Sequence, residues 1–305
     1  MSQGLTAALL GYGSGLGNHR VILPQPEKLD AKLNGLISGG IDSLQVICDF
    51  DQTLSKYQHE GSRVPVSHGA LFSCPGLPVE ERDKLAKFVK YYTPIEKNLE
   101  MSVAEKCPYM VEYWSLAHEL LIKNRLHRSE MESVVKASGI YLRDDAPEFM
   151  RLLRAHSVPL LIFSAGVGNV IEQILDQFDL CSENVKVIAN FMDFDQDGYL
   201  VGFQDPLIHS LNKTLENVQN SDFCQDLVSH RPCVLLIGDS VNDVHMIEEK
   251  FFGGCGSCTI VRIGFLNELV SERLEKYKSA FDVVVLEDET FDVPLMILNR
   301  MIQAS

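Results

Sequence analysis

The chain has 305 residues, of which 46% are hydrophobic and 23% charged; these values are typical of a globular protein and exclude a mainly disordered, collagen-like or coiled-coil chain. With 27 Lys and Arg against 42 Asp and Glu, the formal charge is −15, which argues against binding polymeric nucleic acid, because that requires a basic face. We expect no membrane span, since no run of about 18 apolar residues occurs.

The N-terminal region and the cysteines favour a cytoplasmic protein. Residues 1–20 have no basic start ahead of their apolar stretch, so we expect no signal peptide. The eight Cys are then expected to be reduced thiols. Cys255 and Cys258 have the spacing of half a zinc site, but no second pair is placed to complete it. Residues 1–23 are glycine-rich and weakly patterned, and we expect a flexible N-terminus.

From residue 24 onward, apolar β-rich runs alternate with helical patterns. A helical pattern from Glu27 to Leu36 comes first. We expect strands at 44–51, 158–163, 185–189, 234–237, 258–263 and 283–286. We expect helices between many of them, at 148–155, 169–178 and 241–250. This alternation predicts an α/β fold with a mostly parallel sheet, in which ligands bind at the carboxyl ends of the strands.

Residues 66–147 break the alternation, because they contain no convincing buried strand. Helices are expected at 80–91, 104–124 and 128–137. We interpret this stretch as a helical cap inserted into a core formed by residues 24–65 and 148–305. Further on, Asp193–Gly198 is similar to the opening of a calcium loop, but Gln204 stands where such a loop needs Glu, so we expect a turn.

The first chemical signal is a pair of acids, Asp49 and Asp51, just past a buried strand. Two residues apart, they should lie on the same side of the backbone, where they repel unless a cation lies between them. Mg²⁺ accepts such an oxygen-rich site, and aspartate can also attack phosphorus to form an acyl phosphate. The alternative is a strand that simply ends in solvated acids.

Three further signals follow in chain order. Ser164 and Ala165 lie in a turn of small residues between a strand and a helix, where backbone N–H groups can bind an anion. Lys213 alone would be taken as a surface charge. Asp239 ends another apolar strand, and Asp243, one helical turn later, could hold a metal-bound water. The order of these residues is what makes them significant.

That order resembles the haloacid-dehalogenase-like phosphotransferases. Longer stretches resemble the cytosolic 5′-nucleotidase III family over roughly residue 27 to the end, namely 49–55, 110–112, 163–166, 190–195 and 238–240. The resemblance implies a Rossmann-like parallel core with an inserted cap, and a two-step covalent mechanism. By position, the resemblance implies that Asp49 is the nucleophile and that Asp51 acts first as general acid and then as general base. It implies that Asp49, the backbone carbonyl of Asp51, and Asp239 bind Mg²⁺. It also implies that Ser164, the N–H of Ala165, and Lys213 bind the phosphate.

The same resemblance implies that the cap reads the base. Glu96 aligns with a family glutamate; its carboxylate accepts hydrogen bonds only, which suits N–H donors of guanine or cytosine. The alternative is an exposed acid at a helix start. Trp114, the only Trp, either packs the cap core or stacks on the base. Phe72 is a candidate for the opposite wall of the stack. His68 either borders the pocket or is an ordinary capping or surface histidine.

Tyr113, Trp114 and Ala117 resemble the branch of the family that acts on 7-methylguanosine monophosphate. Methylation at N7 makes the purine cationic, and a cation over a Trp face gains roughly 0.5–2 kcal/mol. We therefore expect a monomeric, Mg²⁺-dependent 5′-nucleotidase that favours 7-methyl-GMP and CMP over UMP, with some phosphate transfer to nucleosides. The alternatives are a pyrimidine-specific 5′-nucleotidase, another capped phosphatase, or a nucleotide-binding module without catalysis.

Overall fold

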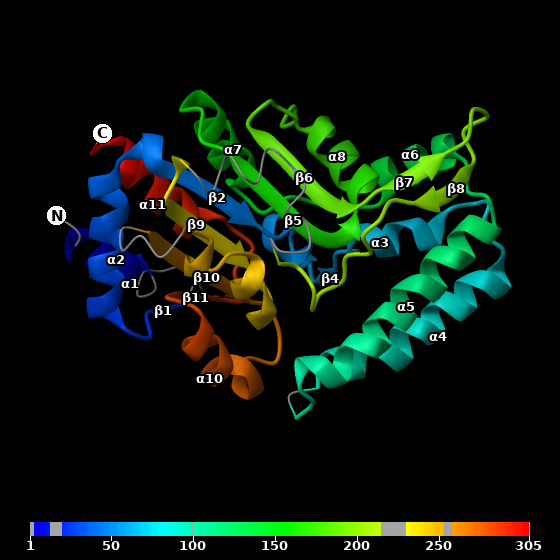
Figure 1. Ribbon diagram of the computed structural model, residues 1–305, viewed down its shortest axis with the longest axis horizontal. Helices are drawn as coiled ribbons and strands as arrows, with labels where there is room; N and C mark the ends of the chain where they lie inside the picture. The colour runs from blue at the N-terminus through cyan, green and yellow to red at the C-terminus, as the bar shows by residue number, and fades with distance from the viewer. Residues whose placement is uncertain (1–2, 13–19, 99, 215–229, 253–257, 305) are drawn as a thin grey trace.

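The computed structural model describes residues 3–12, 20–98, 100–214, 230–252 and 258–304. Their main feature is a seven-stranded sheet in the order β1-β11-β10-β9-β2-β5-β6 (Figure 1). All neighbouring strands in it are parallel except β1, which is antiparallel to β11. The predicted α/β sheet is thus confirmed. The strands are β1 Arg20–Ile22, β2 Leu44–Cys48, β5 Leu160–Val167, β6 Val185–Asn190, β9 Cys233–Gly238, β10 Thr259–Leu266 and β11 Val283–Leu286.

Both faces of the sheet are buried, which explains why its strands are continuous apolar runs. In β9, Leu235 and Ile237 belong to one hydrophobic cluster, whereas Val234 and Leu236 belong to the cluster on the other face. One face carries α1, α2, α7, α8 and α11, and the other carries α10 and the 3₁₀ helix η5. These are α1 Gln3–Tyr12, α2 Pro26–Gly39, α7 Ala146–Ala155, α8 Gly168–Gln177, η5 Val241–Met246, α10 Val270–Ala280 and α11 Asp292–Ile302.

The N-terminal region, expected to be flexible, contains two elements. Residues 3–12 form α1, and residues 20–22 pair with β11, whose edge would otherwise lack a partner; residues 13–19 lie outside the described part of the chain. The expected helix at 241–250 is instead η5 followed by a second 3₁₀ helix, η6, Glu249–Phe252. The Asp243 carboxylate accepts the backbone N–H groups of Asp239 and Ser240, and with the Ser240 side chain it forms a capping box at the start of η5.

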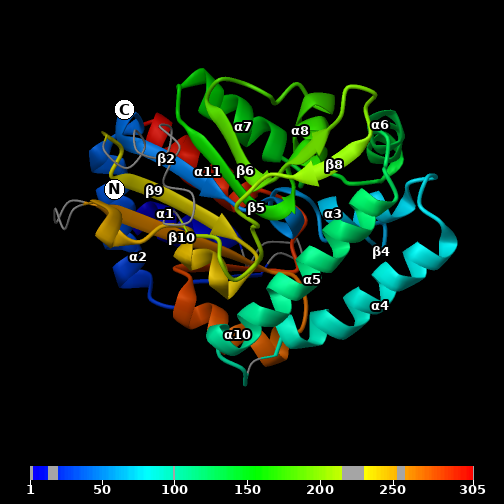
Figure 2. The same ribbon diagram turned by 45° about the vertical axis from the view of Figure 1, so that its right-hand side comes forward.

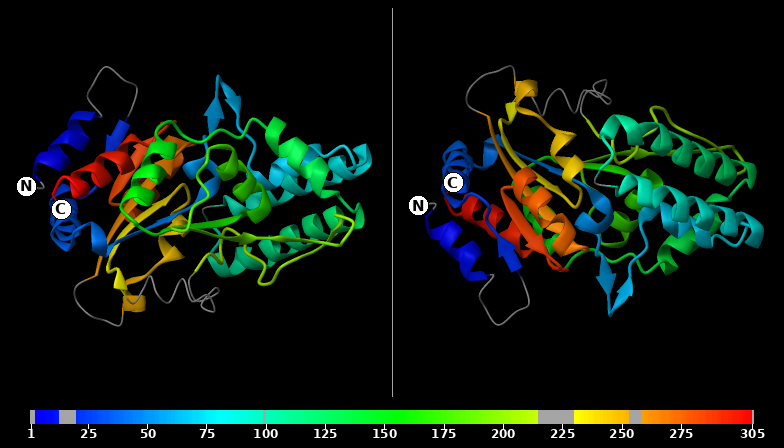
Figure 3. Two further views of the ribbon diagram at one scale, coloured as in Figure 1. Left: turned by 90° about the horizontal axis from the view of Figure 1, so that it is seen from above. Right: turned by 90° about the horizontal axis from the view of Figure 1, so that it is seen from below.

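The predicted helices of the cap region are present. Two of them, α4 and α5, form an antiparallel pair (Figure 2) that lies at the opposite end of the molecule from α1, α2 and α11 (Figure 3). The third, α6, packs against α8. A short hairpin and two short helices lead from the core into this region. The elements are β3 Gln58–His59, β4 Ser62–Arg63, α3 Ser67–Ala70, η3 Leu71–Ser73, α4 Val79–Glu96, α5 Val103–Lys123 and α6 Arg128–Ala137.

One hairpin of the predicted core lies against α5 of the predicted cap. Strands β7, Met192–Phe194, and β8, Leu200–Phe203, enclose the turn expected at Asp193–Gly198. Phe203 stacks on His118 of α5, with ring centroids 3.7 Å apart and planes 5° from parallel. No described helix is long and apolar enough to cross a membrane.

Candidate active site

Adjacent strands bring the predicted site residues together. In the sheet β2 lies between β9 and β5. Asp49 follows β2, Asp239 follows β9, and Ser164 lies in the last half of β5. The N–H of Asp49 donates to the carbonyl of Ile237 on β9 at 2.9 Å, which fixes the two strand ends side by side. The acids and the serine therefore meet at one carboxyl edge of the sheet, as expected for this fold.

Lys213 joins two acids at this edge. Its Nζ lies 2.6 Å from Asp49 Oδ1 and 2.6 Å from Asp243 Oδ1, and all three side chains are buried. Lys213 is therefore not a surface charge. Burial lowers the pKa of Lys213, but Asp243 and Asp49 outweigh burial and hold the pKa above its usual range. Lys213 thus stays charged beside the carboxylate predicted to act as nucleophile.

The charges at this edge are unbalanced. Oxygens of Asp49, Asp239 and Asp243 lie within 4.8 Å of one another, and one ammonium group faces them. Burial raises the pKa of Asp49 to about 7, with Lys213 opposing and Asp243 adding to the rise. Burial, followed by Asp49 and Asp243, raises the pKa of Asp239. A hard divalent cation would relieve this repulsion, and the all-oxygen donor set fits Mg²⁺.

Asp51, the second predicted catalytic acid, is bound by Ser67. The backbone N–H of Ser67 donates to Asp51 Oδ1, and the Ser67 hydroxyl donates to Asp51 Oδ2, both at 2.6 Å. Burial raises the pKa of Asp51 to about 6, while the two Ser67 hydrogen bonds lower it. Ser67 was not among the predicted site residues, because nothing in the sequence pattern connects it with Asp51.

Arg143 supports the turn that follows Asp49 and contains Asp51. This turn, η2 Phe50–Leu54, contains Gln52 at a left-handed φ of 65°. Arg143 is fully buried and donates to the carbonyls of Gln52 and Thr53, each at 2.7 Å. The hydroxyl of Thr53 in turn donates to Asp49 Oδ2 at 3.1 Å. Sequence reasoning missed Arg143, whose partners lie about 90 residues earlier in the chain.

The predicted phosphate-binding residues are tied together by Asn190. Ser164 is buried, and its hydroxyl accepts the N–H of Gly166 at 3.0 Å. Asn190, at the end of β6, donates to the carbonyls of Ala165 at 2.7 Å and Ile208 at 2.8 Å. It thus joins the Ser164 turn to the segment that leads to Lys213. Asn190 lay in a stretch that resembles the family, but no role was predicted for it.

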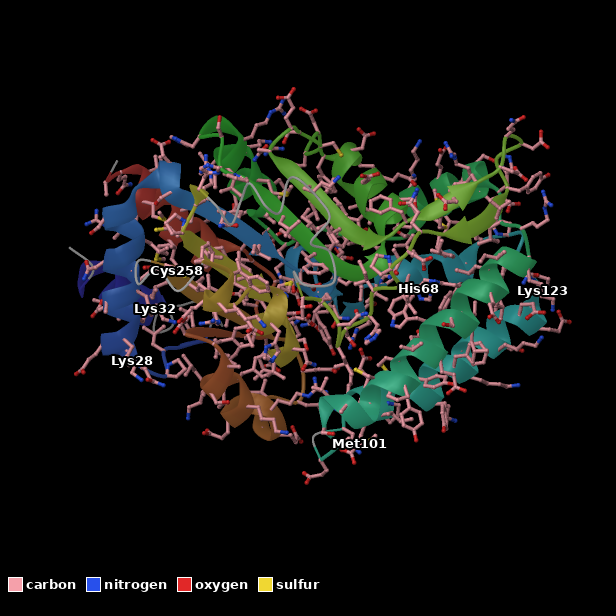
Figure 4. The ribbon with its side chains drawn as sticks, viewed as in Figure 1. Lys28, Lys32, His68, Met101, Lys123 and Cys258 are labelled. Carbon is pink, nitrogen blue, oxygen red and sulfur yellow. The ribbon has the colours of Figure 1, made fainter. Side chains whose placement is uncertain are left out.

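The predicted base-binding residues lie next to this turn. Trp114 is 9% exposed and forms a small cluster with Tyr92 and Met110, against which Ala165 packs. The His68 ring lies 4.7 Å from the Trp114 ring and 5.1 Å from the Phe72 ring. In Figure 4, His68 lies on the side of α5 that faces the core. His68 is buried, so it is not a surface histidine.

Glu96 is the last residue of α4 and not an acid at a helix start. Its side chain is half-buried and accepts a hydrogen bond from the hydroxyl of Ser210. Its carbonyl accepts one from Lys106 at 3.0 Å. The C-terminal end of α4 therefore contacts the segment that leads to Lys213. Of the Cys255–Cys258 pair, Cys255 lies outside the described residues, and Cys258 is a free thiol.

Comparisons with known proteins identify the family of this chain. Residues 52–302 match the family model described as pyrimidine 5′-nucleotidase (UMPH-1). The chain is 38% identical over 282 residues to the human 7-methylguanosine phosphate-specific 5′-nucleotidase, covering 92% of each chain. It is 36% identical over 275 residues to the Drosophila melanogaster protein of that name, covering 90% of this chain and 85% of that one.

Solved structures give the same result. Cytosolic 5′-nucleotidase IIIB bound to cytidine superposes with a TM-score of 0.86 at 32% identity, covering 97% of this chain and 98% of that one. A substrate-bound phosphoserine phosphatase shares the fold, with a TM-score of 0.51 at 16% identity, covering 83% of this chain and 97% of that one. The predicted haloacid-dehalogenase-like fold is thus confirmed. The chain belongs to the pyrimidine 5′-nucleotidase family.

Proposed function

We propose that this chain is a Mg²⁺-dependent 5′-nucleotidase that acts through a phosphoaspartate and favours 7-methyl-GMP and CMP over UMP. The observation that carries the proposal is the cluster of Asp49, Asp239, Asp243 and Lys213 at one edge of the sheet, in which only Asp239 is partly exposed. Membership in a 5′-nucleotidase family, and relatives named for 7-methylguanosine phosphate, support both the reaction and the substrate.

In this reaction the Asp49 carboxylate attacks phosphorus, and the bond between phosphorus and the 5′-oxygen breaks. Asp51 gives its proton to that oxygen, and later takes a proton from the water that cleaves the acyl phosphate. Lys213, the Ser164 hydroxyl and the N–H of Ala165 hold the phosphate. The Lys213 ion pair also favours the ionised Asp49 that attack requires.

Mg²⁺ would be held by Asp49, the carbonyl of Asp51, and Asp239, with Asp243 in support. When bound, it supplies positive charge that offsets the phosphate and the crowded acids, which is the main requirement of phosphoryl transfer. Asp243 holds its place through Lys213 and the N–H groups of Asp239 and Ser240. It supports the site by fixing those neighbours.

We propose that residues 66–147 form the cap domain that recognises the base, on a catalytic core of residues 24–65 and 148–305. Glu96 would accept the N–H donors of the base, and Trp114 would stack on it, with Phe72 on the other side. The 7-methyl group makes guanine cationic, which favours a Trp face. The Trp114 cluster lies against Ala165, so the base would be read next to the phosphate.

The test is phosphate release from 7-methyl-GMP, CMP, UMP, phosphoserine and a hexose phosphate, each with Mg²⁺ or with a chelator. We expect the first two substrates to be fastest, and no turnover after chelation. Asp49→Asn should abolish turnover while nucleotide binding remains measurable. Asp42→Asn, at an exposed acid close in sequence, is the matched control and should match the parent protein. Turnover that survives chelation, or a preference for phosphoserine, contradicts the proposal.

We also propose a cytoplasmic monomer with some nucleoside phosphotransferase activity. A nucleoside hydroxyl that replaces water would open the phosphoaspartate and yield a new nucleotide. Adding cytidine during 7-methyl-GMP hydrolysis should therefore produce CMP, and the absence of CMP would contradict this side reaction. Sedimentation at several concentrations tests the monomer.

A further inference from the structure

Ser67 binds both oxygens of Asp51. Its N–H reaches Oδ1 and its hydroxyl reaches Oδ2, each at 2.6 Å. Ser67 is fully buried and begins α3, the first helix after the β3–β4 hairpin. A side chain clamped through two atoms cannot rotate without breaking one hydrogen bond. The position of the Asp51 carboxyl group is therefore determined by a residue from another part of the chain.

The direction of the Ser67 hydroxyl is fixed as well. The N–H of Val167 donates to Ser67 Oγ at 3.3 Å. The Ser67 hydroxyl therefore accepts a hydrogen bond from Val167 and donates its own proton to Asp51. Gly166 packs against this arrangement. A Cβ added there would lie 2.7 Å from Asp51 Oδ2 and closer still to Ser67 Oγ. Ser67, Gly166 and Asp51 thus form a close-packed unit.

We propose that Ser67 is a positioning residue that holds Asp51 for proton transfer to the leaving 5′-oxygen. The inference rests on the proposed function, in which Asp51 is the general acid. Each carboxyl oxygen has two lone-pair positions, and Ser67 occupies one on each. The proton that moves to the 5′-oxygen, as the phosphorus–oxygen bond breaks, is carried at a remaining position. Without Ser67, the half-buried carboxyl group is free to turn away from the departing oxygen.

Ser67 also links the acid to the cap. The next residue, His68, lies 4.7 Å from Trp114 and 5.1 Å from Phe72, the two residues proposed to enclose the base. The same short helix therefore contacts the acid through Ser67 and the base-binding residues through His68. A shift of α3 would move the acid and the base-binding wall together.

The experiment compares two leaving groups. CMP loses an alkoxide, which must be protonated as it leaves, whereas 4-nitrophenyl phosphate loses a phenolate that leaves without a proton. The quantity measured is kcat/KM, which depends only on the steps up to and including formation of the phosphoaspartate and is independent of the later water attack. Asp51→Asn should lower kcat/KM for CMP by about 10²–10⁴-fold, the usual share of general acid catalysis.

Ser67→Ala should lower kcat/KM for CMP by roughly 10- to 100-fold, the cost of a misplaced group, and change that for 4-nitrophenyl phosphate by less than about threefold. Ser73→Ala, at an exposed serine of the same segment, is the matched control and should leave both values unchanged. If Ser67→Ala unfolds below the assay temperature, Ser67→Cys, with a similar side-chain size and a weaker donor, replaces it with the same expectation.

The outcomes separate the two proposals. Suppose that Asp51→Asn lowers kcat/KM for CMP but not for 4-nitrophenyl phosphate. If Ser67→Ala then leaves kcat/KM for CMP unchanged, or lowers kcat/KM equally for both substrates, Ser67 does not position the acid. The proposed function is unaffected by that result. If Asp51→Asn itself slows both substrates equally, then Asp51 is not the general acid and the proposed mechanism fails with it.

Discussion

Arg143 offers the sharpest test of how the active-site loop is held. Its guanidinium donates to the carbonyls of Gln52 and Thr53 at 2.7 Å and to Asn267 Oδ1 at 2.8 Å, and also to the carbonyl of Asp288. It lies 4.1 Å from the Phe265 ring centroid. Burial lowers the pKa of Arg143 to about 10, although Glu289 and Asp288 oppose this. The side chain remains charged at neutral pH.

Arg143→Lys keeps the charge but removes the planar fork. An ammonium group has three donors at one point, so it cannot reach acceptors on several separate segments. At least two buried acceptors then lose their partners, at a cost of about 1–3 kcal/mol each. We therefore expect Arg143→Lys to lower the free energy of unfolding by roughly 2–6 kcal/mol.

Equilibrium urea unfolding, followed by circular dichroism, measures this difference. Arg151→Lys, at an exposed arginine, is the matched control and should change the unfolding free energy by no more than about 0.5 kcal/mol. The folded Arg143→Lys protein should also lose activity, because Gln52 directly follows Asp51 and the hydroxyl of Thr53 donates to Asp49. An Arg143→Lys protein whose stability falls by less than about 1 kcal/mol would refute the reasoning.

Three further predictions follow from the site. Mg²⁺ at a hundredfold excess over its Kd should stabilise the protein by about 2.7 kcal/mol in thermal unfolding; Asp239→Asn should lose most of this gain, and an equal gain would argue against the metal site. Trp114→Ala should raise KM for 7-methyl-GMP roughly 2- to 30-fold more than for CMP; equal changes would favour simple packing. Burial lowers the pKa of His118 to about 4. Between about pH 6.5 and 4 the unfolded chain therefore protonates His118 while the folded protein does not, and the free energy of unfolding decreases as the pH is lowered through that window. His118→Phe should flatten the slope of unfolding free energy against pH, and an unchanged slope would contradict the assignment.

The sequence was most informative where an apolar run ends in acid. Asp49 and Asp239 lie side by side because each follows a continuous apolar strand, β2 or β9, and parallel strands bring their carboxyl ends together. The resemblance to a known family supplied Lys213, whose two ion pairs join residues far apart in the chain.

The supporting residues were missed because hydrogen bonding leaves no periodic signal. Ser67 reaches back to Asp51, and Arg143 reaches back to Gln52, from irregular or short segments. The helix expected at 241–250 was wrong because apolar spacing does not distinguish an α-helix from the successive short 3₁₀ helices that this segment forms.

The first strand has a practical consequence for anyone who shortens the protein. Residues 20–22 look dispensable in the sequence, yet they cover the outer side of Val283–Leu286. A version that starts at residue 24 would expose β11 as a Val-rich edge strand with unpaired backbone amide and carbonyl groups. Such an edge strand readily pairs with the same strand of another molecule. Removing residues 1–23 is therefore expected to cause self-association through this strand.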